Sequence, residues 1–162
     1  MVRRRQRAVA DAERRYRVLF EHSPAGLFRT GLDGRIMEVN RVLAGILGYD
    51  SVEQMKATVE DMMQVYVDPG ERHRLVERAL RDGSFSQYET RARMRDGRLK
   101  WVSASVLLIR DEAGNPAHFT GSVLDIDERH AIQMALQQSE GKYRTLVEHS
   151  QVGVFIMRED HY

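Results

Sequence analysis

Apolar residues along this chain recur with two different periods, which separates helical from extended stretches. From about Val9 to His22, and again from Ile126 to about His149, they are three or four residues apart, which predicts two helices with narrow apolar faces. Most of the sequence between these helices consists of short apolar runs or alternates with a period of two, as strands do. The face positions are Val9, Ala12, Tyr16 and Leu19 in the first helix and Ile132, Leu136, Ser139, Tyr143 and Leu146 in the second.

Five strands are predicted between the helices. The pair Asp33-Gly34 supplies residues suited to positive φ and predicts a tight hairpin between the first two strands. Leu99–Ile109 is apolar on both faces, so both faces should be covered, and we expect Trp101 to cover the outer one beside Leu107. The five predicted strands are Gly26–Thr30, Arg35–Val39, Ser86–Met94, Leu99–Ile109 and Ala117–Ile126.

Capping residues predict short helices between the second and third strands. Asn40 suits the N-cap of one, and Asp50 or Ser51 that of another. The longest, Pro69–Asp82, has Asp68 as N-cap and ends at Gly83. Its buried stripe is predicted to be Leu75, Val76, Ala79 and Leu80. The element order predicts an α+β fold in which a five-stranded antiparallel sheet is flanked by short helices, with a connector helix at each end.

An internal repeat defines the expected domain boundaries. Glu13–Phe28 recurs 127 residues later as Glu140–Phe155, with nine of 16 positions identical. The first copy opens a unit of domain size, whereas the second has few residues left before Tyr162. We therefore expect an N-terminal connector helix (1–22), one complete domain (23–127), a C-terminal signalling helix (128–149) and the truncated start of a second domain (150–162).

Composition excludes several classes of site. A net charge of +1 gives no argument for nucleic-acid binding, and the chain has no cysteine for a disulfide or a zinc–thiolate site. No apolar run approaches the ~20 residues that span a bilayer, and no signal peptide is visible. We expect no membrane contact within this chain and a cytoplasmic location, which is compatible with a parent protein anchored in a membrane elsewhere.

Six short motifs in the same order resemble the PAS sensor family with its C-terminal PAC half. The resemblance covers about Arg15 to Glu128, and Tyr143 onward is similar to the start of a second PAS domain. The motifs are Ser23-Pro24-x-Gly26, Gly34-Arg35-Ile36-x-x-Val39-Asn40, Leu47-Gly48-Tyr49, Val67-Asp68-Pro69, Arg95-Asp96-Gly97-x-x-x-Trp101-Val102 and Gly121-x-x-x-Asp125-Ile126-Asp127. The resemblance implies a PAS fold with a small apolar pocket, upstream of a histidine kinase, diguanylate cyclase or other effector.

The resemblance also suggests which residues line that pocket. Met55, Met62 and Met63 fall in the helices that flank it in this family, and methionine adapts to irregular cavities. Ordinary core filling is the alternative for each of them. Further candidates for the pocket are Leu47, Leu75 and Tyr88.

No cofactor is identified by the sequence. Some PAS branches bind haem through a histidine on the long helix, but His73 lies at the edge of the predicted stripe, one position from the ligand in that branch. The flavin branch that forms a photoadduct is excluded because it needs a cysteine. The six histidines lack metal-ligand spacing, and no catalytic motif is present, so we expect no enzymatic activity from this chain itself.

Two functions remain open at this point. One is a sensory domain that detects a small apolar molecule or metabolite and passes the signal to neighbouring PAS and output domains. The other is a ligand-free module that dimerises and relays. In both, the face from Ile132 to Leu146 has the period of a two-stranded coiled coil and predicts a parallel homodimer, with Asp125 at the junction between sheet and helix.

Overall fold

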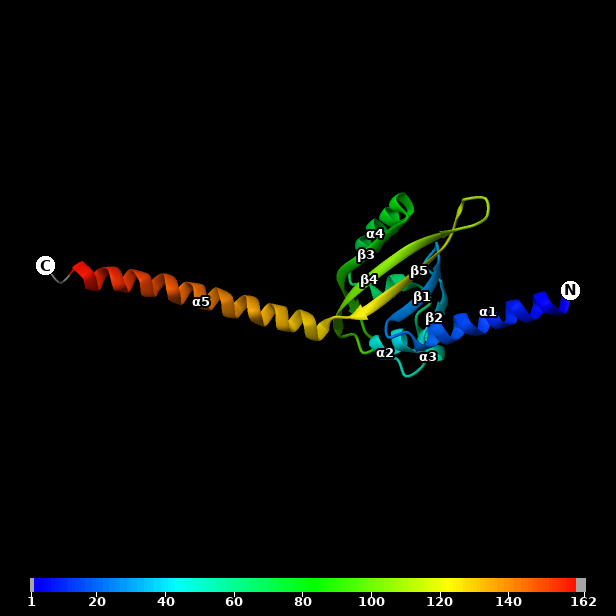
Figure 1. Cartoon of the computed structure of the whole chain (residues 1–162), viewed down its shortest axis with the longest axis horizontal. Helices are drawn as coiled ribbons and strands as arrows, with labels where there is room; N and C mark the ends of the chain where they lie inside the picture. The colour runs from blue at the N-terminus through cyan, green and yellow to red at the C-terminus, as the bar shows by residue number, and fades with distance from the viewer. Residues whose placement is uncertain (1, 160–162) are drawn as a thin grey trace. The chain divides into compact units, whose positions relative to one another are not determined.

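The computed structural model describes the backbone of residues 2–159 and the side chains of residues 2–149. The chain forms two compact units, of which the first ends at Ile126 and the second begins at Asp127 (Figure 1). The elements of the first unit are α1 (Val2–His22), β1 (Gly26–Gly31), β2 (Ile36–Val39), α2 (Arg41–Ile46), α3 (Val52–Thr58), a 3-10 helix η1 (Met62–Val65), α4 (Pro69–Asp82), β3 (Ser84–Arg93), β4 (Leu99–Arg110) and β5 (Pro116–Asp125). The second unit contains α5 (Asp127–Glu159).

The five strands form one antiparallel sheet in the order β2-β1-β5-β4-β3. The last strand in the sequence lies in the middle because it pairs with β1 on one side and with β4 on the other. This arrangement confirms the predicted α+β fold with a five-stranded antiparallel sheet and flanking helices. In Figure 1, α4 lies beside β3 and β4, while α2 and α3 lie together near β1 and β2.

One face of the sheet carries the core, because alternate residues of each strand point toward α2, α3, η1 and α4. A first cluster of buried side chains joins β1 and the centre of the sheet to the short helices, and a second lies beneath α4. The first includes Phe28, Val39, Leu43, Leu47, Met55, Val102 and Val123. The second consists of Leu75, Ala79, Phe85, Leu108 and Phe119.

Asn40 connects three elements and is completely buried. As predicted, it caps α2, with Oδ1 accepting from the Leu43 amide at 3.0 Å. The same Oδ1 accepts from the Leu27 amide at 2.8 Å, and Nδ2 donates to the carbonyls of Phe20 at 2.9 Å and Ala25 at 3.0 Å. Its amide group therefore ties the end of α1 and the start of β1 to α2.

The bounds and caps of α4 agree with the prediction, but its buried stripe does not. Asp68 accepts from the Gly70 amide, and Gly83 ends the helix at φ 83°. Leu80, predicted to be buried, is 38% exposed, whereas Arg72 is buried. Arg72 lies three residues before Leu75 and seven before Ala79, so it occupies the same side of the helix as these two residues.

A β-bulge changes the alternation of β3. The register with β4 shifts between Phe85 and Tyr88, and Gln87 has a φ of 53°. The Gln87 amide donates to the Ser105 hydroxyl at 3.0 Å. Because the bulge adds a residue, Phe85 and Tyr88 point to the same face, and Ser86, predicted to share the face of Tyr88, is exposed.

The opposite, outer face of the sheet is covered only in part within the first unit. Tyr16 of α1 packs there against Arg29, whose guanidinium lies 5.7 Å from the ring centroid. Trp101 is half-buried against Arg91, but Leu107, six residues further along β4, is 50% exposed. The expectation that Trp101 covers Leu107 is wrong, because six residues of strand separate the two by roughly 20 Å.

The two terminal helices extend beyond their predicted limits. α1 begins at Val2 rather than near Val9, and α5 continues to Glu159 rather than ending near His149. Pro24 forces the chain out of helix after α1. Its equivalent in the repeat is Gln151, which imposes no such restriction. The assignment of 150–162 to a second domain stays a prediction.

Candidate functional site

Two small cavities lie in the core between the sheet and the helices. Each has a volume of about 50 Å³. Four residues border both cavities and separate one from the other; they come from β1, η1, the segment after η1 and β4. These shared residues are Phe28, Met62, Tyr66 and Val106.

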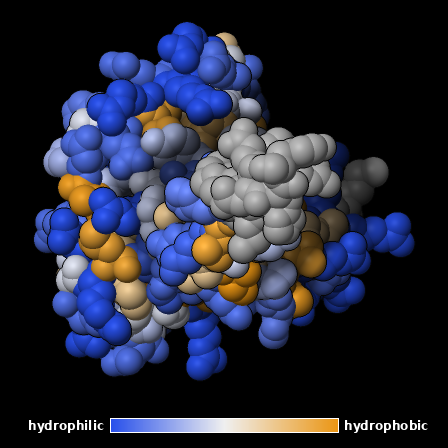
Figure 2. Space-filling view, turned by 90° about the vertical axis from the view of Figure 1, so that its left-hand side faces the viewer, coloured by the Kyte–Doolittle hydropathy of each residue, from blue (hydrophilic) through white to orange (hydrophobic). Residues whose placement is uncertain are grey.

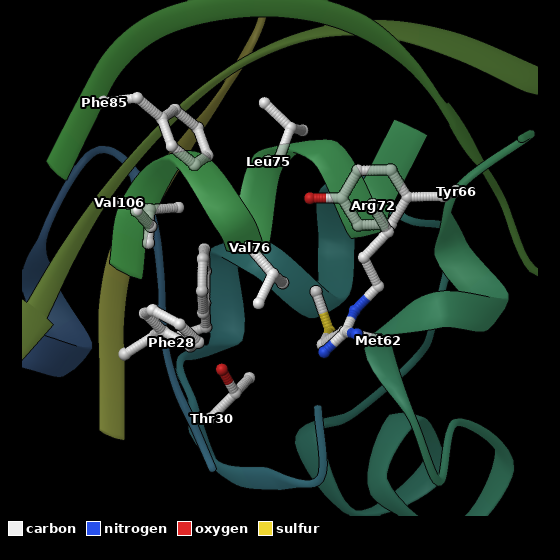
Figure 3. Close-up of a pocket in the computed structure, with 11 residues that line it drawn as sticks. Phe28, Thr30, Met62, Tyr66, Arg72, Leu75, Val76, Phe85 and Val106 are labelled. Atoms are coloured by element: carbon white, nitrogen blue, oxygen red, sulfur yellow. The ribbon is translucent and has the colours of Figure 1, made fainter. Parts of the chain in front are cut away.

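The first cavity combines an apolar wall with three polar side chains (Figure 3). Thr30 reaches it from β1, Tyr66 from the segment after η1, and Arg72 from α4. In Figure 3 the Arg72 guanidinium lies beside Met62 and below Tyr66, and Thr30 lies across from it near Phe28. The apolar wall consists of Phe28, Met62, Leu75, Val76, Ala79, Phe85, Val106 and Phe119.

The second cavity lies beneath α2 and is mainly aliphatic. Its additional lining comes from α2, η1 and three strands of the sheet. These residues are Leu43, Leu47, Val65, Thr90, Arg91, Ala92, Val102, Ala104 and Val123.

Three of the six predicted pocket residues line these cavities. Leu47 borders the second, Leu75 the first, and Met62 both. Met55 is fully buried in the first core cluster and borders neither cavity. Neither Met63 nor Tyr88 borders a cavity. Met63 is half-buried, and the Tyr88 ring packs edge-on against Phe85 with a distance of 6.1 Å between ring centroids. Whether any of the six contacts a ligand stays a prediction.

The polar residues of the first cavity were not among the predicted site residues. Arg72 had a visible signal, because it lies at the centre of the apolar stripe of its helix rather than on the charged side. No sequence signal marked Tyr66 or Thr30, because each is a single amphipathic or polar residue in a short segment. Burial raises the pKa of Tyr66 to about 12, with Arg72 opposing this shift and Glu71 adding to it. The Tyr66 hydroxyl is therefore a neutral hydrogen-bond donor at neutral pH.

The turn between β1 and β2 makes room for Arg72. Of the predicted pair, only Gly34 has a positive φ, of 93°, so Asp33 is not part of a mirror-image hairpin turn. A Cβ at Gly34 would collide with Nη2 of Arg72 and with Oδ1 of Asp61. The absence of a side chain at Gly34 thus lets the Arg72 guanidinium lie against the turn.

The side chains that could suggest another chemistry lie elsewhere. His73 is exposed, and its Nδ1 lies 3.2 Å from the Pro69 carbonyl oxygen. Among the described residues, no group of three or more histidine, cysteine or acidic side chains is arranged to hold a metal ion. No described helix is long and apolar enough to cross a membrane.

The predicted relay residues fall at the end of β5 and along α5. Asp125 accepts from Lys100 Nζ at 2.9 Å, which fixes the end of β5 against β4. Ser139 is exposed, as are the four larger residues of the predicted face, whose exposures are 60% for Ile132, 57% for Leu136, 71% for Tyr143 and 68% for Leu146. In the face shown in Figure 2, hydrophobic residues form small groups among hydrophilic ones.

A model of the PAS fold family matches residues 20–131. Among solved structures, the PAS domain of a protein from Colwellia psychrerythraea superimposes with a TM-score of 0.63 at 21% identity, over 72% of this chain and 98% of that one. This likeness agrees with the fold described above.

Two curated relatives are much longer signalling proteins. The probable diguanylate cyclase DgcE of Escherichia coli (strain K12) is 26% identical over 138 residues, which cover 84% of this chain and 12% of that protein. The sensor histidine kinase TmoS of Ectopseudomonas mendocina is 26% identical over 135 residues, covering 81% of this chain and 14% of the relative. The chain thus spans about an eighth of the length of the curated relatives that it matches.

Proposed function

Because this chain belongs to the PAS fold family, we propose that it is a sensory domain that detects a small molecule in its core and relays the signal through α5. The observation that carries this proposal is the pair of cavities between the sheet and the helices that cover it. Protein interiors are normally packed with few voids larger than a water molecule, so two adjacent cavities of about 50 Å³ are places where a small ligand fits.

The parent protein is proposed to carry a kinase or cyclase output domain. The support is that the matched relatives are a probable diguanylate cyclase and a sensor histidine kinase. In this proposal the chain itself contributes sensing and relay, and catalysis belongs to another domain of the same protein.

Native mass spectrometry of the purified protein tests the sensing function. A bound small molecule is expected as a mass above that of the chain. Ala79→Leu adds three carbons at a position that is 1% exposed and borders the first cavity, so it should lower ligand occupancy. Ala57→Leu is the matched control, because Ala57 is exposed on α3 and should leave occupancy unchanged.

The ligand-free relay is the second candidate function, and the small size of the cavities favours it. It predicts a native mass equal to the chain alone, and no thermal stabilisation by small organic molecules. Binding that is lost in Ala79→Leu but kept in Ala57→Leu would exclude it.

We also propose that the relay acts through a homodimer of α5. Apolar side chains that are 57–71% exposed along one face of a helix gain free energy when a second copy covers them. The spacing of Ile132, Leu136, Ser139, Tyr143 and Leu146 favours a two-stranded coiled coil.

Sedimentation equilibrium tests the dimer. Leu136→Glu places two like charges in the seam and should give monomers, whereas Gln137→Glu, on the adjacent exposed position, should leave the dimer intact. A wild-type protein that is monomeric at high micromolar concentration would refute the coiled-coil relay.

A further inference from the structure

The first cavity contains three polar groups without hydrogen-bonding partners. Thr30 is 4% exposed and Arg72 is 9% exposed. Within the described residues, the side chains of Thr30, Tyr66 and Arg72 form no hydrogen bond or salt bridge. The nearby amide of Asn40, in contrast, makes four hydrogen bonds to the backbone. Buried polar groups are normally paired, so an unpaired set facing a single cavity calls for a partner inside it.

The charge on Arg72 narrows the choice of partner. Water in the cavity can satisfy hydroxyl groups, but it does not neutralise the positive charge of Arg72, which an anionic partner would do. Two carboxylates lie nearby: Glu71 accepts from the Thr90 hydroxyl at 2.7 Å, and Asp61 accepts from the Met63 amide at 2.8 Å. Neither forms a salt bridge with Arg72 among the described side chains. The Arg72 guanidinium in the cavity wall therefore has hydrogen-bond donors and a positive charge available to a ligand.

The remaining surface and the volume limit the size of a ligand. A cavity of about 50 Å³ has room for roughly three to five waters, which is close to the non-hydrogen atoms of an acid with about two to four carbons. Leu75 and Val76 of α4 add an aliphatic surface next to Arg72. A ligand that matches both the cation and this surface has one small anionic end and one short apolar end.

We infer that this cavity binds a short-chain aliphatic monocarboxylate. The Arg72 guanidinium pairs with the carboxylate, the hydroxyls of Tyr66 and Thr30 donate to its oxygens, and the alkyl chain packs against Leu75 and Val76. Guanidinium suits this role because its fork of donors matches the two oxygens of a carboxylate. The inference rests on the proposed sensing function and specifies the chemical class of the ligand.

Binding of propionate and of propionamide, measured by isothermal titration calorimetry on protein with no bound compound, tests the charge requirement. The two molecules have nearly the same size, but only propionate is an anion at neutral pH. We expect propionate to bind at least tenfold more tightly than propionamide. Equal affinity for the two would overturn the assignment of an anion and leave the sensing proposal in place, whereas binding of neither would count against both.

Substitutions on α4 test the assignment to Arg72. Arg72→Met should weaken propionate binding at least tenfold, and Arg74→Met should leave it unchanged, because Arg74 is on the same helix with its side chain 69% exposed. If Arg72→Met does not fold, Tyr66→Phe removes one donor at nearly constant volume and should weaken propionate, but not propionamide, several-fold. Propionate binding that is unaffected by a folded Arg72→Met or by Tyr66→Phe would refute the inference.

Discussion

Asn40 provides a sharp test of how the first unit is held together. If it acted only as the N-cap of α2, its replacement by alanine would cost about 1 kcal/mol. The structure adds three further hydrogen bonds, from the Leu27 amide and to the carbonyls of Phe20 and Ala25. Each contributes about 1 kcal/mol net, and their partners have little access to water once the amide is gone. We therefore expect Asn40→Ala to lower the free energy of unfolding by roughly 4 kcal/mol.

Urea denaturation followed by tryptophan fluorescence measures this loss. Trp101 is the single tryptophan and lies on β4, so it reports the unfolding of the sheet and not of α5. With a urea slope of about 1–3 kcal/mol/M, the midpoint should fall by more than about 1 M. Hydrogen exchange at the Leu27 and Leu43 amides should also become faster, because both donate to Asn40 Oδ1.

Two further variants separate the possible causes. Ser51→Ala removes a cap that accepts only from the Gln54 amide, at 3.0 Å, and should cost about 1 kcal/mol. Asn40→Asp keeps the acceptor but brings a carboxylate against two carbonyl oxygens, so it should lose at least as much as Asn40→Ala. If Asn40→Ala is no more destabilising than Ser51→Ala, the four-bond account is wrong.

Two other predictions concern Tyr66, which borders both cavities, and the close packing around Gly121. Burial raises the pKa of Tyr66 from 10.0 to about 12, so the folded state favours the neutral hydroxyl. The stability that this contributes should be lost as the pH rises from about 10 to about 12. Over that range the urea midpoint of Tyr66→Phe should fall less than that of the wild type. A Cβ on Gly121 would collide with the Phe28 ring and the Ser105 carbonyl oxygen, so Gly121→Ala should cost about 1–3 kcal/mol in urea denaturation. Gly45→Ala, on the exposed side of α2 with nothing within 4 Å of its Cβ, should be neutral or stabilising; a Gly121→Ala variant as stable as Gly45→Ala would contradict this.

The elements that could be predicted from the sequence are those with strong local signals. α4 was predicted with its observed bounds because Asp68, Pro69 and Gly83 act through the backbone next to them. The strands agree to within a few residues for the same reason. The bulge in β3 could not be predicted, because the bond from the Gln87 amide to the Ser105 hydroxyl depends on pairing with a distant strand.

The candidate site was predictable only in part. Leu47, Met62 and Leu75 follow from apolar periodicity and the family resemblance. Arg72 was visible as a charge within an apolar stripe, but its meaning depends on what surrounds it. Tyr66, Thr30 and the turn at Gly34 come close to it only because β1, β2 and α4 pack together, and none of that proximity is encoded by local spacing.

The central strand gives the proposed signal a physical route to the end of the first unit. Phe119 of β5 borders the first cavity and Val123 borders the second, so a ligand in either cavity would press on the same strand. Val123 lies two residues before Asp125, whose carboxylate accepts from Lys100 Nζ at 2.9 Å. The Ile126 amide then donates to the Trp101 carbonyl at 3.0 Å. In the proposed relay, a displacement of β5 at Val123 would act on these two bonds, which join the end of β5 to β4 directly before α5 begins at Asp127.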